Sequence, residues 1–147
     1  MVITEMDRAD CLALLQKCRI GRLACSASDQ PYVIPISFVV DGGYIYSFSL
    51  TGQKIEWMRQ NSKVCLQADE LENKRNWRSV IVYGRYEELP DRIGTKVQRD
   101  RAWALLSQHA QWWEPGGLKP VAEAPAPHLF YRISIDEVTG RKARPIA

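Results

Sequence analysis

The sequence contains little that would bind a metal or form disulfides. Its four cysteines include no C-x-x-C pair, and its two histidines lie far from all of them along the chain. Structural zinc is held by closely spaced Cys and His ligands, so no metal site is expected. The cysteines are expected to be reduced thiols, most of them buried.

Long apolar runs and export signals are also lacking. The longest nearly apolar stretch, residues 31–40, is much shorter than the roughly 20 residues that a transmembrane helix needs. The first ten residues carry three carboxylates and no basic-then-apolar signal pattern. We therefore expect a cytoplasmic protein with no membrane segment.

The length and composition are those of one ordinary globular domain, which we take to span residues 1–147. The chain is 46% hydrophobic and 25% charged, far from the composition of disordered proteins. Its net charge is only +3, and the basic residues are interleaved with acidic ones instead of forming a block. This distribution argues against a small nucleic-acid-binding barrel, although the aromatic residues would suit one.

The hydrophobic pattern predicts a mainly β protein with flanking helices. Apolar spacing favours helices over 4–18, 51–61 and 99–113, and β-branched or aromatic runs favour strands over 22–27, 32–40, 44–49, 63–71, 77–89 and 129–135. Asp41-Gly42-Gly43 is typical of a hairpin turn between the second and third strands. Six strands with a helix after the hairpin indicate an antiparallel, closed or partly closed barrel with helices on its outside.

The long strand over 77–89 must bend. Thirteen extended residues span roughly 43 Å, more than a compact domain of this size accommodates in a straight line. Gly84 is the expected corner, because glycine inside a strand commonly marks a bulge or a barrel bend. Residues 80–83 are apolar in consecutive positions, so we expect both faces covered, one by the barrel interior and one by a helix or a second subunit.

A lysine lies where a helix begins. With Thr51 as the N-cap, Leu50 and Ile55 would form a hydrophobic staple, and Lys54 would lie in the first turn, where the helix dipole disfavours a cation. A phosphate would reverse that penalty, held by the helix amides, the hydroxyls of Ser49 or Thr51, and Lys54. The alternative is a solvated surface lysine, the more frequent meaning of a lone lysine in this position.

A proline interrupts the strand over 32–40. Pro35 lacks a backbone donor, so it is expected where the sheet has an edge or where its ladder is interrupted. An interrupted ladder would leave peptide groups free to bind the polar edge of a planar heterocycle. An ordinary edge strand explains Pro35 equally well. Together, Pro35 and Lys54 are compatible with a flat ring along the hairpin and its phosphate at the following helix.

These segments resemble the FMN-binding split-barrel superfamily related to pyridoxamine 5′-phosphate oxidase, in the branch of nitroimidazole-resistance flavoproteins. The resemblance is carried, in order, by residues 19–24, 31–38, 44–48, 52–54, 61–65 and 77–84. It implies a six-stranded split barrel of the FMN-binding type and a homodimer with flavin sites between its subunits.

The resemblance also implies the roles of individual residues. The cofactor-binding positions it marks are Val33, Ile34, Pro35, Ile36 and Ser37 along the isoalloxazine ring, Ser47, Phe48 and Ser49 near the ribityl chain and phosphate, Thr51, Gln53 and Lys54 at the phosphate, and Ser79 at the flavin from the long strand, across or near the dimer interface. Many relatives have a second basic residue where this chain has Gln53. The substrate-binding basic residues of the true oxidases have no clear match, so oxidation of pyridoxamine phosphate is not expected.

The resulting hypothesis is an FMN-dependent oxidoreductase or reductase that acts on an unidentified small molecule. The residues suggest no catalytic triad or carboxylate pair, so the chemistry would come from the cofactor. The alternative is a non-enzymatic protein of the same fold that binds flavin, haem or a deazaflavin as a sensor or store.

Overall fold

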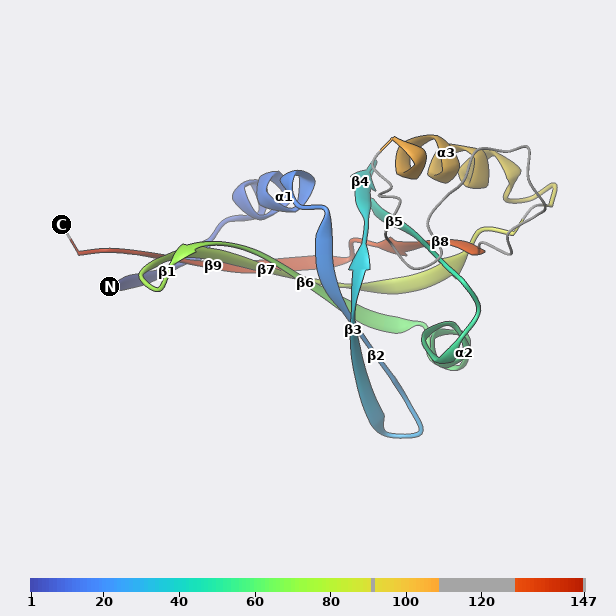
Figure 1. The fold of residues 1–147 in the computed structure, drawn as a ribbon, viewed down its shortest axis with the longest axis horizontal. Coiled ribbons are helices and arrows are strands. Elements are labelled where there is room, and N and C mark those ends of the chain that lie inside the picture. Colours follow the sequence, from blue (N-terminus) through green and yellow to red (C-terminus); the bar gives the residue numbers. More distant parts are fainter. Residues whose placement is uncertain (91, 109–128, 147) are drawn as a thin grey trace.

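The computed structural model describes residues 1–90, 92–108 and 129–146 of the chain (Figure 1). Nine strands and three helices are found in these residues, in the order β1 (Val2–Met6), α1 (Arg8–Lys17), β2 (Ile20–Ala27), β3 (Gln30–Ser37), β4 (Val39–Asp41), β5 (Tyr44–Ser49), α2 (Gln53–Gln60), β6 (Lys63–Asn73), β7 (Asn76–Glu88), α3 (Lys96–Ser107), β8 (Leu129–Ser134) and β9 (Glu137–Arg144).

The strands form an antiparallel barrel that is not closed. They follow the order β3-β2-β6-β7-β8-β5-β4, and β9 pairs with both β7 and β1. The first and last strands of this series, β3 and β4, are separated in sequence only by Phe38, and no ladder joins them. A side-chain hydrogen bond crosses the split, from Ser47 Oγ to the Ser37 carbonyl at 2.6 Å. The predicted mainly β split barrel is therefore confirmed.

Most predicted elements are present, but several differ from their predictions. All six predicted strands occur, but the one expected over 32–40 is divided into β3 and β4. The strands β1 and β9 are missing from the sequence prediction; they pair with each other and hold the two ends of the described chain side by side (Figure 1). As a result, the first helix begins at Arg8 instead of Thr4, capped by Asp7, whose carboxylate accepts from the Asp10 amide at 2.8 Å.

The third helix also differs from its prediction. The sequence pattern favoured a helix over 99–113, whereas α3 spans Lys96–Ser107. Residues 109–113 lie outside the described residues. Ala102 and Leu106 of α3 pack with Phe48 and Phe130 in a second, smaller apolar cluster outside the barrel.

Gly84 is the corner of the long strand β7. Residues 77–83 of β7 pair with β9, and residues 86–88 pair with β8, so the partner changes at this glycine. A Cβ atom at position 84 would lie 1.7 Å from the Ser134 carbonyl oxygen. The predicted bend is confirmed, and its cause is the close approach of two backbones.

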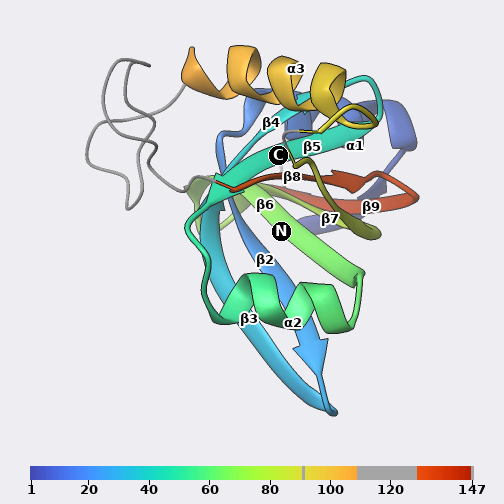
Figure 2. The same ribbon diagram turned by 90° about the vertical axis from the view of Figure 1, so that its right-hand side faces the viewer.

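The helices leave one face of the sheet uncovered by the described chain. Helices α1 and α3 lie on one side of the molecule and α2 lies on the other, packed against β2 (Figure 2). Val80 and Val82 of β7 are buried in the barrel, whereas Tyr83 is 46% exposed on the opposite side. Only one face of residues 80–83 is therefore fully covered within a single chain. We call the uncovered side the outer face; it includes Val33, Pro35, Arg22, Gln67, Ser79, Ile81 and Tyr83.

Candidate functional site

Helix α2 begins one residue later than predicted. Its N-cap is Gly52, which has no side chain to bond the first amides, and Thr51 is exposed without a capping bond. The prediction that Thr51 caps the helix is therefore wrong. Lys54 still lies in the first turn, at its second position. The unfilled cap leaves the first amides of α2 available to an external acceptor.

Lys54 has no carboxylate partner among the described residues. Its side chain is half-buried, and burial is the main cause that lowers its pKa. Cys25 on β2 would partly offset this effect, but only as a charged thiolate. Burial raises the pKa of Cys25, so that thiol is neutral near pH 7 and gives no counter-charge. A half-buried cation at an uncapped helix N-terminus makes this place a candidate anion site.

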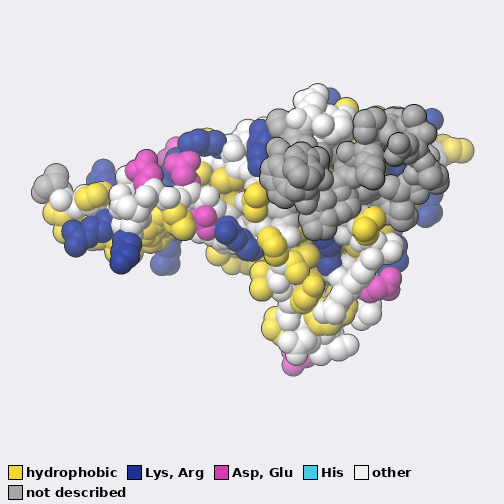
Figure 3. Space-filling model, in the orientation of Figure 1, with side chains coloured by type: hydrophobic (Ala, Val, Ile, Leu, Met, Phe, Trp, Pro, Cys, Tyr) yellow, Lys and Arg dark blue, Asp and Glu magenta, His cyan; other side chains and the backbone are white. Residues whose placement is uncertain are grey.

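Strand β3 lies at the edge of the sheet and, within the described part of the chain, pairs only with β2, where Pro35 stands opposite Arg22. The edge-strand interpretation of Pro35 is thus confirmed. Along β3, Val33 is 62% exposed and Pro35 is exposed, whereas Ile36 is buried in the core. A ligand beside β3 would therefore meet the side chains of Val33 and Pro35, but only the main chain of Ile36. Figure 3 shows hydrophobic side chains exposed over this hairpin of β2 and β3.

The end of β5 is hydrogen-bonded to β3 and leads directly into α2. Ser47 and Phe48 are buried, and the Ser47 hydroxyl donates to Ser37 across the split. Ser49 is half-buried, and its hydroxyl donates to the Leu50 carbonyl at 2.6 Å. The predicted segments 33–37, 47–49 and 51–54 are thus joined by one hydrogen bond and a short stretch of chain.

Ser79 does not join this group within one chain. It lies on β7, three strand spacings from β3, which is about 14 Å across the sheet. Its hydroxyl accepts from Gln67 Nε2 at 3.0 Å, and the same nitrogen donates to Asp69 at 2.9 Å. Asp69 in turn accepts from Arg22 at 3.3 Å, so a polar row crosses the outer face from β7 to β2. This row was not predicted from the sequence, although its residues alternate with buried ones along each strand, which is the signal of an exposed face.

A cleft of about 450 Å³ lies beside Ser79 on the outer face. It is lined by Glu5, Met6, Trp77, Ser79, Ile81, Val138, Thr139, Gly140 and Arg141. The cleft lies over β1, β7 and β9, away from Lys54 on α2.

Over residues 1–90, 92–108 and 129–146, no three His, Cys, Asp or Glu side chains form a group that could hold a metal ion. All four cysteines are free. No helix in the described part of the chain is long and apolar enough to cross a membrane.

The fold is that of an open split barrel with a candidate anion site at α2, and comparison with known proteins identifies the family. Residues 7–142 match the family model described as pyridoxamine 5′-phosphate oxidase, and the chain belongs to this family. A Rhizobium meliloti protein, itself uncharacterised, is 45% identical over 146 residues, which are 97% of each chain.

Solved structures agree with this assignment. The crystal structure of a FAD-binding protein from Mesorhizobium loti is 48% identical, with a TM-score of 0.83 over 97% of this chain and 99% of that one. A Bacteroides thetaiotaomicron structure named for 5-nitroimidazole antibiotic resistance shares the fold at 16% identity, with a TM-score of 0.71 over 97% of this chain and 89% of that one. The resemblance drawn from the sequence is confirmed.

Proposed function

We propose that this protein is a cytoplasmic flavoprotein that uses a bound flavin as an oxidoreductase toward a small molecule. The observation that carries the proposal is the half-buried Lys54, which has no carboxylate partner in the described residues and lies at the uncapped start of α2. A flavin 5′-phosphate would supply the missing negative charge. The FAD-binding relative at 48% identity supports this assignment.

The residues present fit a flavin nucleotide in two respects. Lys54 and the free amides of α2 would bind the 5′-phosphate. The edge strand β3, with Val33 and Pro35 exposed beside the split, would lie along the ring. Bound flavin supplies hydride and electron transfer, for which the described residues offer no substitute of their own. Because FMN and FAD share the 5′-phosphate, this argument holds for both; our prediction is FMN.

Reconstitution tests the proposal. The protein, stripped of cofactor, is titrated with riboflavin, FMN and FAD while flavin fluorescence is followed. We expect FMN to bind at least tenfold more tightly than riboflavin, because only FMN carries the phosphate that pairs with Lys54. Equal affinities for riboflavin and FMN, or no binding of any flavin, would contradict the assignment. A FAD affinity well above that for FMN would replace FMN as the cofactor.

Reduction of the bound flavin distinguishes an enzyme from a protein that only binds flavin. The reconstituted protein is mixed with NADH or NADPH under anaerobic conditions, and the flavin absorbance is recorded. Bleaching supports a reductase. A flavin that stays oxidised with both donors favours the sensor or storage alternative.

We also propose that the protein acts as a homodimer through the outer face. Ile81 and Tyr83 are not fully covered within one chain. Ser79 lies about 14 Å from β3, so it would complete a flavin site only from a second subunit. Light scattering is expected to give twice the chain mass for the wild type. The control variant Val97→Glu, which adds the same charge at an exposed position of α3, should give the same mass. Tyr83→Glu should dissociate at micromolar concentration, because it places charge in the interface. A monomeric wild type contradicts the proposal.

A further inference from the structure

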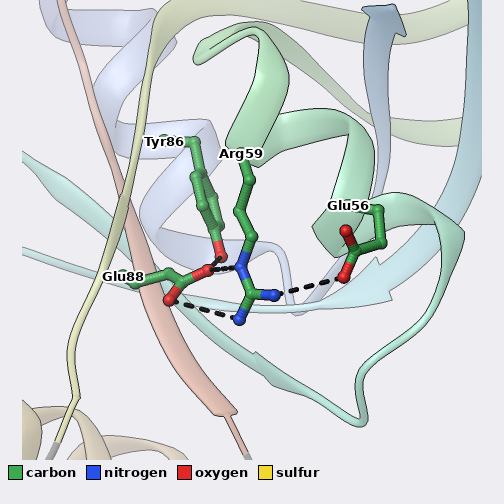
Figure 4. Close-up of polar contacts among 4 residues, drawn as sticks. All are labelled: Glu56, Arg59, Tyr86 and Glu88. Atoms are coloured by element: carbon green, nitrogen blue, oxygen red, sulfur yellow. Dashed lines mark hydrogen bonds and ion pairs between the residues drawn. The ribbon is translucent and has the colours of Figure 1, made fainter.

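One set of polar contacts joins α2 to the sheet, and Figure 4 shows it. Arg59, in the last turn of α2, donates through Nε to Glu88 at the end of β7 and through Nη2 to the same carboxylate at 3.5 Å. Its Nη1 donates to Glu56 of α2 at 3.2 Å. The Tyr86 hydroxyl donates to Glu88 at 2.9 Å. We call Arg59, Tyr86 and Glu88 the Arg59 bridge.

Among the described residues of α2, only Arg59 has a side chain hydrogen-bonded to a strand. The buried Ile55 and Met58 attach the helix by apolar contacts, and its C-cap residue Asn61 donates from Nδ2 to Ser26 Oγ on β2 at 3.2 Å. The fully buried Ile55 and Met58 fix which face of α2 points into the core, so the freedom that remains to this short helix is a small rotation about its axis. A charged, bidentate contact at the opposite end of the helix removes that freedom.

The bridge and Lys54 are mechanically coupled through the helix. Arg59 lies five positions after Lys54, which is roughly 7.5 Å along the axis and more than one full turn. The two side chains therefore leave α2 in different directions. Holding Arg59 against β7 sets the rotation of the helix and hence the direction in which Lys54 and the first amides point.

Charge keeps the bridge formed. Burial works toward a higher pKa for Glu88, but the hydrogen bonds from Arg59 and Tyr86 outweigh it and hold the pKa below its ordinary value. Burial, together with the bond to Glu88, raises the pKa of Tyr86, which therefore remains a donor. Near neutral pH the carboxylate is charged and has both donors.

We propose that the Arg59 bridge is a positioning device for Lys54 and that it sets the affinity of the protein for the flavin phosphate. This inference rests on the proposed function. Glu88 and Arg59 act through the orientation of α2, without contact to the flavin. The bridge therefore affects the binding of flavins that carry a phosphate and leaves the binding of riboflavin unchanged.

The substitution Glu88→Gln tests this inference, because a positioning role and a purely electrostatic role predict changes of opposite sign in the affinity for FMN. Removing a negative charge near the site would by electrostatics alone tighten the binding of an anion. Loss of the bridge instead misplaces Lys54 and should weaken FMN binding, by roughly tenfold. Riboflavin affinity should not change. Glu87→Gln is the matched control, since the neighbouring Glu87 carries the same charge but bonds Arg132 on β8.

A milder variant keeps the test valid if Glu88→Gln folds poorly. Tyr86→Phe removes only the hydroxyl that donates to Glu88 and should weaken FMN binding by roughly two- to threefold, again without an effect on riboflavin. FMN affinity of Glu88→Gln equal to or tighter than that of the wild type would overturn the inference, as would equal losses for FMN and riboflavin. A wild type that binds no flavin, or that does not distinguish FMN from riboflavin, would instead overturn the proposed function and this inference with it.

Discussion

Replacing Lys54 by glutamate is expected to lower the affinity for FMN by about a hundredfold or more. A charge-assisted hydrogen bond to a phosphate contributes about 1.5–3 kcal/mol, and each 1.4 kcal/mol is a factor of ten in affinity. The glutamate removes this bond and adds repulsion in a half-buried position, where water screens charges less than at the surface. Fluorescence titration of the stripped protein measures the effect.

Two control variants isolate the role of Lys54. Lys63→Glu makes the same change of charge at an exposed position at the start of β6, and it should alter FMN affinity by less than about threefold. Lys54→Met removes the charge but keeps an apolar side chain of similar length, so its loss should be intermediate. Unchanged FMN affinity in Lys54→Glu would refute the assignment of Lys54 to the phosphate.

The same lysine predicts how the flavin-free protein responds to pH. Burial lowers the pKa of Lys54 below its ordinary value of 10.5, so the folded chain binds this proton less readily than the unfolded chain does. Below the lowered pKa, protonated Lys54 therefore opposes folding, and this penalty disappears as the pH rises toward the value of the unfolded chain. Lys54→Met lacks the penalty and should be at least as stable as the wild type near neutral pH. One residue thus reduces the stability of the empty protein and favours its ligand.

The sequence predicts the local features of the candidate site better than the boundaries of the elements that carry them. The hairpin, the edge strand with Pro35 and a lysine in the first turn of α2 all follow from local chemistry: glycine turns, a missing donor and a misplaced cation. The N-cap does not, because Thr51 is the better capping residue locally and only the path of the chain after β5 makes Gly52 the cap.

Pairings between distant segments could not be predicted. Strands β1 and β9 lie at opposite ends of the sequence, and each acquires its partner only in the folded chain. Both alternate polar and apolar residues weakly, so neither gives a clear period of two. The Arg59 bridge escapes prediction for the same reason, since Arg59 and Glu88 are 29 residues apart and each alone resembles an ordinary surface charge.

Gly84→Ala is expected to have the largest effect on stability. Its Cβ would lie 1.7 Å from the Ser134 carbonyl oxygen and 2.9 Å from Ile133, so β7 and β8 must separate where β7 changes partner. Overpacking by one methyl group in a tight core costs about 1–3 kcal/mol, and a clash with backbone cannot be relieved by a change of rotamer. We expect a loss of about 3 kcal/mol or more in the free energy of unfolding, a large share of the 5–15 kcal/mol of an ordinary domain.

Urea denaturation of the flavin-free protein measures this loss, and Gly94→Ala provides its control. A Cβ at Gly94 would meet no atom within 4 Å, so that variant should unfold within about 0.5 kcal/mol of the wild type. A Gly84→Ala variant as stable as Gly94→Ala would show that the corner of β7 does not depend on glycine. Because β7 carries Ser79 before the corner and Tyr86 and Glu88 after it, the bend places the outer-face serine and the Arg59 bridge on two arms of one strand. Loss of the corner should therefore lower flavin affinity as well as stability.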